Sequence, residues 1–214
     1  AGSGKTYIIN QYIKFLKERR IPVAVTASTG IAATHMNGMT IHAWSGIGVR
    51  NHISKNDLIS MREKKYLREK LQQVKVLIID EISMLHKNQL NLVNKVLKYF
   101  KESDRAFGSI QIVFCGDFFQ LPPIGMPTEM ARDKFAFMSS AWLEASPAIC
   151  YLQEQHRQKD NRLNQILNEI RDRQIGHESK KYLQERLNTP EVAANQAPVL
   201  YTHNQDVSRT NNNY

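Results

Sequence analysis

The chain has 214 residues, 42% of them hydrophobic, so it can bury a core and could hold one large or two small domains. Its apolar runs fall far short of the roughly 20 residues of a membrane-spanning helix, so we expect no membrane partner. The net charge of +9 favours a polyanionic partner, nucleic acid before a membrane surface, although a basic protein without such a partner carries the same charge. Cys115 and Cys150 lie in apolar runs without metal-ligand spacing, which predicts buried thiols in a reducing, intracellular compartment. Nucleus, mitochondrion and bacterial cytoplasm are not distinguished.

The first six residues match the end of the phosphate-binding loop G-x-x-x-x-G-K-[ST], whose leading glycine would lie upstream of Ala1. Glycines let successive backbone N–H groups point at phosphate oxygens, and the helix after the loop directs its positive end at the same anion. Lys5 would reach the β- and γ-phosphates of ATP, and the Thr6 hydroxyl would ligate Mg²⁺. The residues expected to bind the nucleotide are Gly2, Ser3, Gly4, Lys5 and Thr6. The alternative is a Gly-Ser turn before an amphipathic helix that happens to carry Lys and Thr.

Strands and helices alternate along the first two thirds of the chain. We expect helices over residues 5–19, 31–33, 55–73 and 88–100, and strands over 23–26, 74–79 and 110–115. Residues 38–48 are predicted to form a glycine-rich loop, and the charged helix 55–73 to present a solvated face. Apolar strands that alternate with helices predict an α/β fold, a parallel sheet with helices on both faces. Active sites of such sheets lie at the carboxyl ends of the strands, here residues 26–30, 80–81 and 116–120.

After Ala148 the pattern restarts, which predicts a domain boundary and two domains, residues 1–147 and 148–214. In the second domain we expect strands over 149–152 and 199–202, helices over 161–173, 178–187 and from Asp206, and surface loops at 189–190 and 195–198.

Asp80 and Glu81 come directly after an apolar strand. After a phosphate-binding loop, a strand-end aspartate is where Mg²⁺ must be coordinated. The adjacent Glu81 can polarise a water for in-line attack on the γ-phosphorus. Two acids can also cap a strand or begin a helix, so the preceding loop is the feature that favours the catalytic interpretation.

Residues 116–123 read GDFFQLPP. The glycine frees the strand end, the two prolines stiffen the chain beyond the glutamine, and the Gln120 amide can bridge a terminal phosphate and a neighbouring domain. The alternative is a rigid turn that places Phe118 and Phe119 in the core.

Five stretches follow one another along the chain: residues 1–6, 26–33 (TASTGIAA), 40–42 (TIH), 77–85 (LIIDEISML) and 113–123 (VFCGDFFQLPP). Together they resemble the motifs of the Pif (petite-integration-frequency) family of superfamily-one DNA helicases, near relatives of RecD-like helicases. The QLPP after GDFF separates this set from clamp-loader-type ATPases. The resemblance covers essentially the whole chain. It implies a P-loop NTPase (RecA-like) domain over residues 1–147, its N-terminal strand missing, and the start of a second RecA-like domain over 148–214.

The resemblance implies a role for each matching residue. Lys5 and the loop amides would hold ATP phosphates, and Thr6 and Asp80 would hold Mg²⁺. Glu81 would be the base for water, and Gln120 would sense the γ-phosphate.

Arg157 resembles the arginine of the family's fourth motif, which projects from the second RecA-like domain onto the γ-phosphate. An exposed basic residue before a helix is the alternative. The chain departs from the family in a short segment between residues 83 and 108. It also stops before the small β-barrel and the last two motifs, so we expect this part alone not to unwind duplex.

The family's nucleic-acid contacts map onto Ser28, Thr29, Gly30, His42 and Trp44. A turn of small hydroxyl residues and glycine can offer N–H and O–H donors to a phosphate, and His42 and Trp44 could stack a base. For both rings the alternative is a packing anchor beside glycines.

The resemblance implies an ATP-dependent DNA helicase that moves 5′→3′ on single-stranded DNA by hydrolysing Mg-ATP. Its partners would be single-stranded DNA and DNA forks. It would act in DNA repair, recombination or telomere maintenance. Two alternatives stay open. One is a RecD-like subunit of a nuclease or conjugation complex. The other is a nucleic-acid-binding module without ATP turnover, against which the intact Asp80-Glu81 pair argues.

Overall fold

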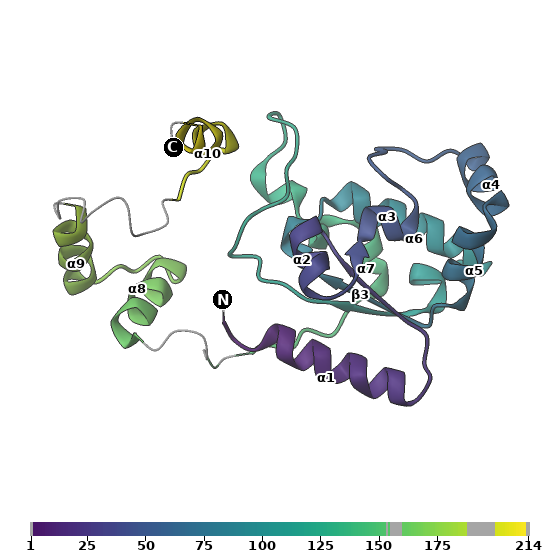
Figure 1. Ribbon diagram of the computed structural model, residues 1–214, viewed down its shortest axis with the longest axis horizontal. Coiled ribbons are helices and arrows are strands. Elements are labelled where there is room, and N and C mark those ends of the chain that lie inside the picture. The colour runs from purple at the N-terminus through teal and green to yellow at the C-terminus, as the bar shows by residue number, and fades with distance from the viewer. Residues whose placement is uncertain (1, 153, 155–159, 188–199, 213–214) are drawn as a thin grey trace. The chain divides into compact units, whose positions relative to one another are not determined.

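A computed structural model describes residues 2–152, 154, 160–187 and 200–212 (Figure 1). The chain divides into two compact units, residues 1–159 and 160–214. The first unit holds the sheet and all three strand-end clusters that the sequence singles out.

Four parallel strands form the sheet, in the order β2-β1-β3-β4. The strands are β1 (Val23–Ala27), β2 (Met39–Thr40), β3 (Val76–Asp80) and β4 (Gln111–Phe114). In β3 every residue is buried, as expected for a central strand covered on both faces. Ala27 pairs with Asp80 and Ile79 with Phe114, so the carboxyl ends of three strands meet at one edge. The parallel α/β sheet predicted from the sequence is confirmed.

The helices of this unit are α1 (Lys5–Glu18), α2 (Gly30–His35), α3 (Ile41–Ser45), α4 (Lys55–Glu63), α5 (Lys65–Gln73), α6 (Lys87–Lys101) and α7 (Ser140–Ala145). Short 3₁₀ turns are η1 (Ile82–Met84), η2 (Ala106–Ser109), η3 (Ala131–Lys134) and η4 (Ala136–Met138). Figure 1 shows α1 on one side of the sheet and α3 and α6 on the other.

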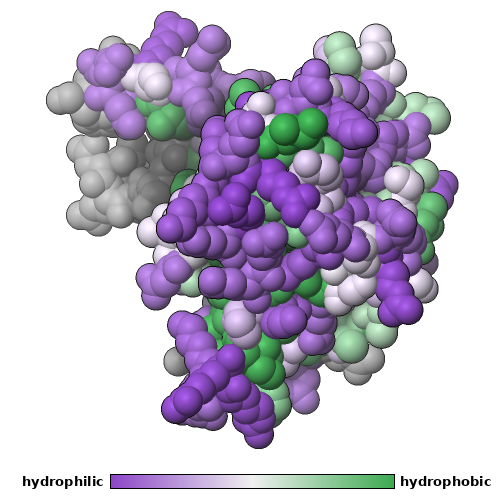
Figure 2. Space-filling view, turned by 90° about the vertical axis from the view of Figure 1, so that its right-hand side faces the viewer, coloured by the Kyte–Doolittle hydropathy of each residue, from purple (hydrophilic) through white to green (hydrophobic). Residues whose placement is uncertain are grey.

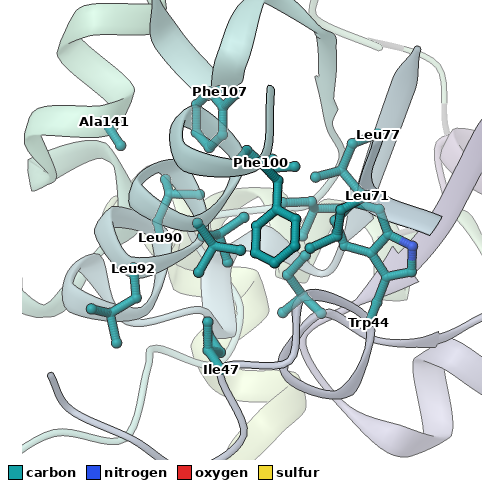
Figure 3. Close-up of a cluster of buried hydrophobic side chains, with 14 of the residues drawn as sticks. Trp44, Ile47, Leu71, Leu77, Leu90, Leu92, Phe100, Phe107 and Ala141 are labelled. Carbon is teal, nitrogen blue, oxygen red and sulfur yellow. The ribbon is translucent and has the colours of Figure 1, made fainter. Parts of the chain in front are cut away.

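Alternate residues of β3 feed two hydrophobic cores, because successive side chains of a strand point to opposite faces. Val76 and Ile78 belong to the smaller core, with Ile9, Ile13 and Leu16 of α1. Leu77 and Ile79 belong to the larger core, which α3, α5, α6 and α7 cover (Figure 3). This larger core includes Trp44, Leu71, Leu90, Phe100 and Phe107. The two cores fix α1 and the strand ends in one rigid frame.

Two short segments differ from the sequence predictions. The charged helix expected over 55–73 is two helices, because Lys64 between them is extended, with φ −72° and ψ 98°. The loop expected over 38–48 contains β2 and α3, and the Thr40 hydroxyl caps α3 by accepting from the Ala43 N–H at 3.2 Å. The end of the unit that carries α4 and α5 is mostly hydrophilic, in keeping with the expected solvated face (Figure 2).

The second unit contains α8 (Asn161–Arg171), α9 (His177–Leu187) and α10 (Asn204–Asn211), which confirms its three predicted helices. The strand expected over 149–152 is not formed, and Ile149 and Tyr151 are 67% and 81% exposed. Residues 200–202 also form no strand, and the expected loops at 189–190 and 195–198 lie outside the described residues. The boundary at 147/148 and a second RecA-like domain stay predictions.

The absence of a strand over 149–152 also corrects one cysteine prediction. Cys115 is buried as expected, whereas Cys150 is exposed. An apolar run of four residues buries its side chains only where the fold supplies a partner surface, which local sequence does not reveal. In the described part of the chain, no helix has the length and apolar character that crossing a bilayer requires.

Candidate nucleotide-binding site

The chain enters α1 through two glycines in the left-handed region. Gly2 and Gly4 have φ of 84° and 82°, a conformation that glycine adopts without a steric cost. Gly4 is the N-cap of α1, and no side chain among the described residues caps the helix. The first turn of α1 carries Lys5 and Thr6 and no acidic residue. This helix end therefore suits an anion, through its N–H groups, its dipole and the Lys5 ammonium.

A strained acidic turn lies directly after β3. Glu81 has φ 52° and ψ 44°, a left-handed conformation that costs a glutamate about 1–2 kcal/mol. The Asp80 carboxylate accepts from the Glu81 N–H at 2.9 Å. From the turn after β1, the Ser28 N–H donates to the Asp80 carbonyl at 3.1 Å, and the Ser28 hydroxyl donates to the Glu81 carbonyl at 2.7 Å. On the other side, the Ile82 N–H donates to the Cys115 carbonyl at 2.9 Å. Neighbours on both sides thus hold the turn in its strained form.

Charged groups from three elements act on Glu81. Burial is the largest cause that raises the pKa of Glu81, Asp80 and Asp117 raise it further, and Lys5 lowers it. Burial also raises the pKa of the Cys115 thiol to about 12, with added repulsion from Asp80 and a hydrogen bond between the two side chains. The thiol is therefore protonated at neutral pH and donates to the Asp80 carboxylate. The α1 N-terminus, the end of β3 and the end of β4 hence share one electrostatic site.

The turn after β4 approaches the acidic turn closely. A Cβ on Gly116 would lie 3.0 Å from both the Cγ2 atom and the backbone nitrogen of Ile82, so only glycine fits without displacement. Asp117 then folds the next residues back, since its carboxylate accepts from the Phe119 N–H at 3.1 Å and from the Gln120 amide at 3.2 Å. Asp117 thereby orients the Gln120 side chain beside the residues that surround Glu81.

The two phenylalanines of this turn have different environments. Phe118 packs edge-on against Phe135, Phe137 and Trp142, with ring centroids 5.8, 4.9 and 6.0 Å away. Phe119 is 74% exposed. The core-packing alternative for this motif therefore holds for Phe118 and is wrong for Phe119.

The structure thus brings Lys5, Asp80 and Glu81 together, and Gln120 joins them through Asp117. Cys115 and Asp117 also lie at this site; the sequence analysis assigned Cys115 only to the core and gave Asp117 no role of its own. Their only sequence signal is their position on either side of Gly116. Arg157 lies outside the described residues, so its predicted role is unchanged.

Oxygen donors at this site fit a hard cation. Within the described ranges, no three His, Cys, Asp or Glu side chains converge on a possible metal position. An ion would therefore take few protein ligands, such as the Asp80 carboxylate and the Thr6 hydroxyl, and would complete its shell with phosphate and water. Mg²⁺ is bound in this way at many nucleotide sites.

The turn expected to contact DNA leads directly into α2. Thr29 caps this helix, its hydroxyl accepting from the Ala32 N–H at 3.3 Å. Gly30, the first residue of α2, is exposed. The Ser28 hydroxyl therefore donates its proton within the protein, whereas the Thr29 hydroxyl acts as an acceptor in its cap and keeps a proton to donate, and Gly30 beside it is exposed.

The two predicted stacking residues lie on α3 and have different surroundings. His42 is half-buried, and burial lowers its pKa, so the ring is neutral near pH 7. Trp44 is only 4% exposed and lies in the larger core with Leu71 and Leu77 (Figure 3). The Lys70 ammonium lies 5.8 Å from its ring centroid. For Trp44 the structure favours the packing alternative, because no ring face is open to a base.

The fold and this grouping of residues define a class, the RecA-like P-loop nucleotide-binding domains. A family model described as PIF1-like helicase matches residues 1–178, and the chain belongs to that family. The family resemblance noted in the sequence is confirmed.

Three relatives show how much of the family's length the chain represents. It is 54% identical over 219 residues to the ATP-dependent DNA helicase Pif1 of Psychrobacter sp. (strain PRwf-1), covering 99% of this chain and 33% of that protein. It resembles the crystal structure of Pif1 helicase from Candida albicans with a TM-score of 0.86 and 35% identity, over 100% of this chain and 48% of that one. It also resembles the crystal structure of Pif1 helicase from Bacteroides in complex with ADP-AlF3 and ssDNA. The TM-score is 0.81 and the identity 31%, and the match covers 100% of this chain and 51% of that one. The chain therefore spans a third to a half of these relatives.

Proposed function

We propose that the full-length protein is an ATP-dependent DNA helicase that moves along single-stranded DNA. The observation that carries this proposal is the convergence of Lys5, Asp80 and Glu81 at neighbouring strand ends, with Gln120 attached through Asp117. Phosphoryl transfer depends on positioning and electrostatic stabilisation, which these residue types supply. The relative from Bacteroides was solved with ADP-AlF3 and ssDNA, which supports a nucleotide and a single strand as ligands of this fold.

Each residue has a defined task in this proposal. Lys5 and the N–H groups at the start of α1 bind the β- and γ-phosphates of ATP. Thr6 and Asp80 would hold Mg²⁺, which when bound neutralises charge on the phosphates. Glu81 in its ionised form orients the attacking water and accepts its proton. Gln120 contacts the γ-phosphate and changes position when that group leaves.

The DNA side of the proposal rests on Thr29 and Gly30, which follow Ser28 in the same turn, and on His42. These residues lie after β1 and β2, at the same edge of the sheet as the nucleotide groups. Arg157 would project from the second domain and stabilise charge on the γ-phosphate, so that closure and hydrolysis occur together. The 5′→3′ direction, a preference for forks and a setting in DNA repair, recombination or telomere maintenance extend the same proposal. An intracellular location does too, because ATP and DNA meet there.

Two alternatives make different demands. A module that binds nucleic acid without turnover would not need a strained Glu81 with a raised pKa beside Lys5, so the acidic turn argues against it. A RecD-like subunit would use the same site and differ in its protein partners.

The deciding experiment measures ATP hydrolysis by the full-length protein with and without an oligothymidylate single strand. We expect slow turnover that single-stranded DNA stimulates, and loss of turnover with retained ATP binding in Glu81→Gln. Glu18→Gln, an exposed charge change at the end of α1, is the matched control and should keep the wild-type rate. A wild-type protein that binds the strand but hydrolyses no ATP would favour the non-hydrolysing module. Affinity for the strand should fall steeply with salt, since phosphate contacts release counterions.

A further inference from the structure

We propose that Ser28 is a positioning residue for Glu81: its hydroxyl holds the acidic turn in its strained form and links the turn expected to contact DNA to the catalytic base. The inference rests on the proposed function, and it assigns Ser28 a task other than the phosphate contact implied by the family resemblance.

The sheet places Ser28 beside Glu81. β1 and β3 are parallel neighbours, and Ala27 at the end of β1 pairs with Asp80 at the end of β3. The residues that follow, Ser28 and Glu81, are therefore adjacent as well. The Ser28 N–H donates to the Asp80 carbonyl at 3.1 Å, and its hydroxyl donates to the Glu81 carbonyl at 2.7 Å. A serine hydroxyl has one proton. While that proton is bonded to the Glu81 carbonyl, it cannot also be donated to a DNA phosphate.

The bond matters because Glu81 is left-handed. A glutamate keeps φ 52° only where its surroundings impose it, and the direction of its side chain depends on that backbone. The Glu81 carbonyl also accepts from the Met84 N–H at 3.0 Å, and the Ile82 N–H is held by the Cys115 carbonyl. Among these contacts to the Glu81 carbonyl and the Ile82 N–H, only the one from Ser28 comes from a side chain. A single substitution can therefore remove it.

Ser28 is also the first residue of the turn that enters α2. Thr29 caps α2 through its hydroxyl, and its carbonyl accepts from the Ala33 N–H at 3.0 Å. A strand of nucleic acid seated on this turn would therefore act on the Glu81 carbonyl through one hydrogen bond. This arrangement gives single-stranded DNA a direct structural route to the rate of hydrolysis.

The test separates a positioning role from a binding role in the full-length protein. For Ser28→Ala we expect kcat at saturating ATP and oligothymidylate to fall by roughly 10- to 100-fold, the effect of a small misplacement of a catalytic group. The Kd for the oligothymidylate should stay within about twofold, because the phosphate-binding backbone is unchanged. Ser28→Thr, which keeps the hydroxyl, should restore most of kcat. Ser28→Cys, a weaker donor of similar size, should be intermediate.

Thr34→Ala is the matched control. Thr34 makes the same kind of bond, from its hydroxyl to the Gly30 carbonyl at 3.0 Å, on the exposed side of α2. The Thr34→Ala variant should have the kcat of the wild type and the same Kd for the oligothymidylate. A Ser28→Ala protein with wild-type kcat and a weaker Kd would overturn the inference and make Ser28 a phosphate contact. If the wild type itself shows no DNA-stimulated hydrolysis, the proposed function fails instead. Thermal unfolding of each variant shows whether it still folds. If Ser28→Ala does not fold, the comparison of kcat between Ser28→Thr and Ser28→Cys decides, and equal kcat values in these two variants would overturn the inference.

Discussion

Gly116→Ala tests whether the close approach of the β4 end to the acidic turn governs both stability and hydrolysis. The added methyl carbon would lie 3.0 Å from the backbone nitrogen and from Cγ2 of Ile82, and 3.4 Å from the nitrogen of Ser83. The two contacts with Ile82 are a few tenths of an ångström inside ordinary van der Waals distance, whereas the contact with Ser83 is at its limit. Ile82 cannot easily move away, because it is 2% exposed and its N–H is bonded to the Cys115 carbonyl at 2.9 Å.

The cost can be worked out from this geometry. Forcing one extra carbon into a well-packed site destabilises a protein by about 1–3 kcal/mol. For a domain of this size, each kcal/mol lowers Tm by about 2–4 °C, so we expect a fall of about 2–12 °C. The displacement acts on the backbone that holds Glu81, so kcat should fall as well.

Differential scanning calorimetry and steady-state ATP hydrolysis measure the two effects. Gly30→Ala is the control for the stability measurement, because a Cβ at Gly30 meets nothing within 4 Å and alanine is favoured over glycine in a helix. Its Tm should equal or exceed that of the wild type. A Gly116→Ala protein that melts at the wild-type temperature with unchanged kcat would refute the close-approach argument.

Four further predictions use other parts of the site. Because burial and neighbouring carboxylates raise the pKa of Glu81 and a base acts only when ionised, kcat should decline with falling pH at values above the usual glutamate range; a pH profile with its acidic limb at the ordinary value would contradict this. Trp44→Ala should lower the free energy of unfolding by about 3–5 kcal/mol in denaturant titrations, and Trp44→Phe by much less; near-native stability with weaker DNA binding would restore its stacking role. His42→Ala should weaken binding of single-stranded DNA by about 1–3 kcal/mol in fluorescence anisotropy, and an unchanged Kd would make the ring a packing residue. Arg157→Ala should keep ATP binding and lose hydrolysis, whereas equal rates in mutant and wild type would exclude an arginine finger.

Local sequence predicts the elements that carry strong periodicity or a bounded apolar run. α6 and β3 are examples, because an apolar stripe at helical spacing or an unbroken run of branched apolar residues suits one backbone period only. The same reasoning is wrong for residues 149–152, where an apolar run lacks a strand to pair with in the described chain. Local reasoning also predicted α4 and α5 as one helix, because a lysine such as Lys64 gives no signal that a helix ends there.

The sequence by itself determined which chemical groups are present and where they stand relative to the elements, because motif spacing places Lys5 at the start of a helix and Asp80 and Gln120 at or after the ends of strands. Only the tertiary structure decided which of these groups meet. The pairing of β1 with β3 joins residues more than fifty positions apart, and packing of two cores rather than local propensity sets its register. That register places the Ser28 hydroxyl on the Glu81 carbonyl beside the left-handed Glu81, and packing of α3 into the larger core buries Trp44; a local pattern encodes neither.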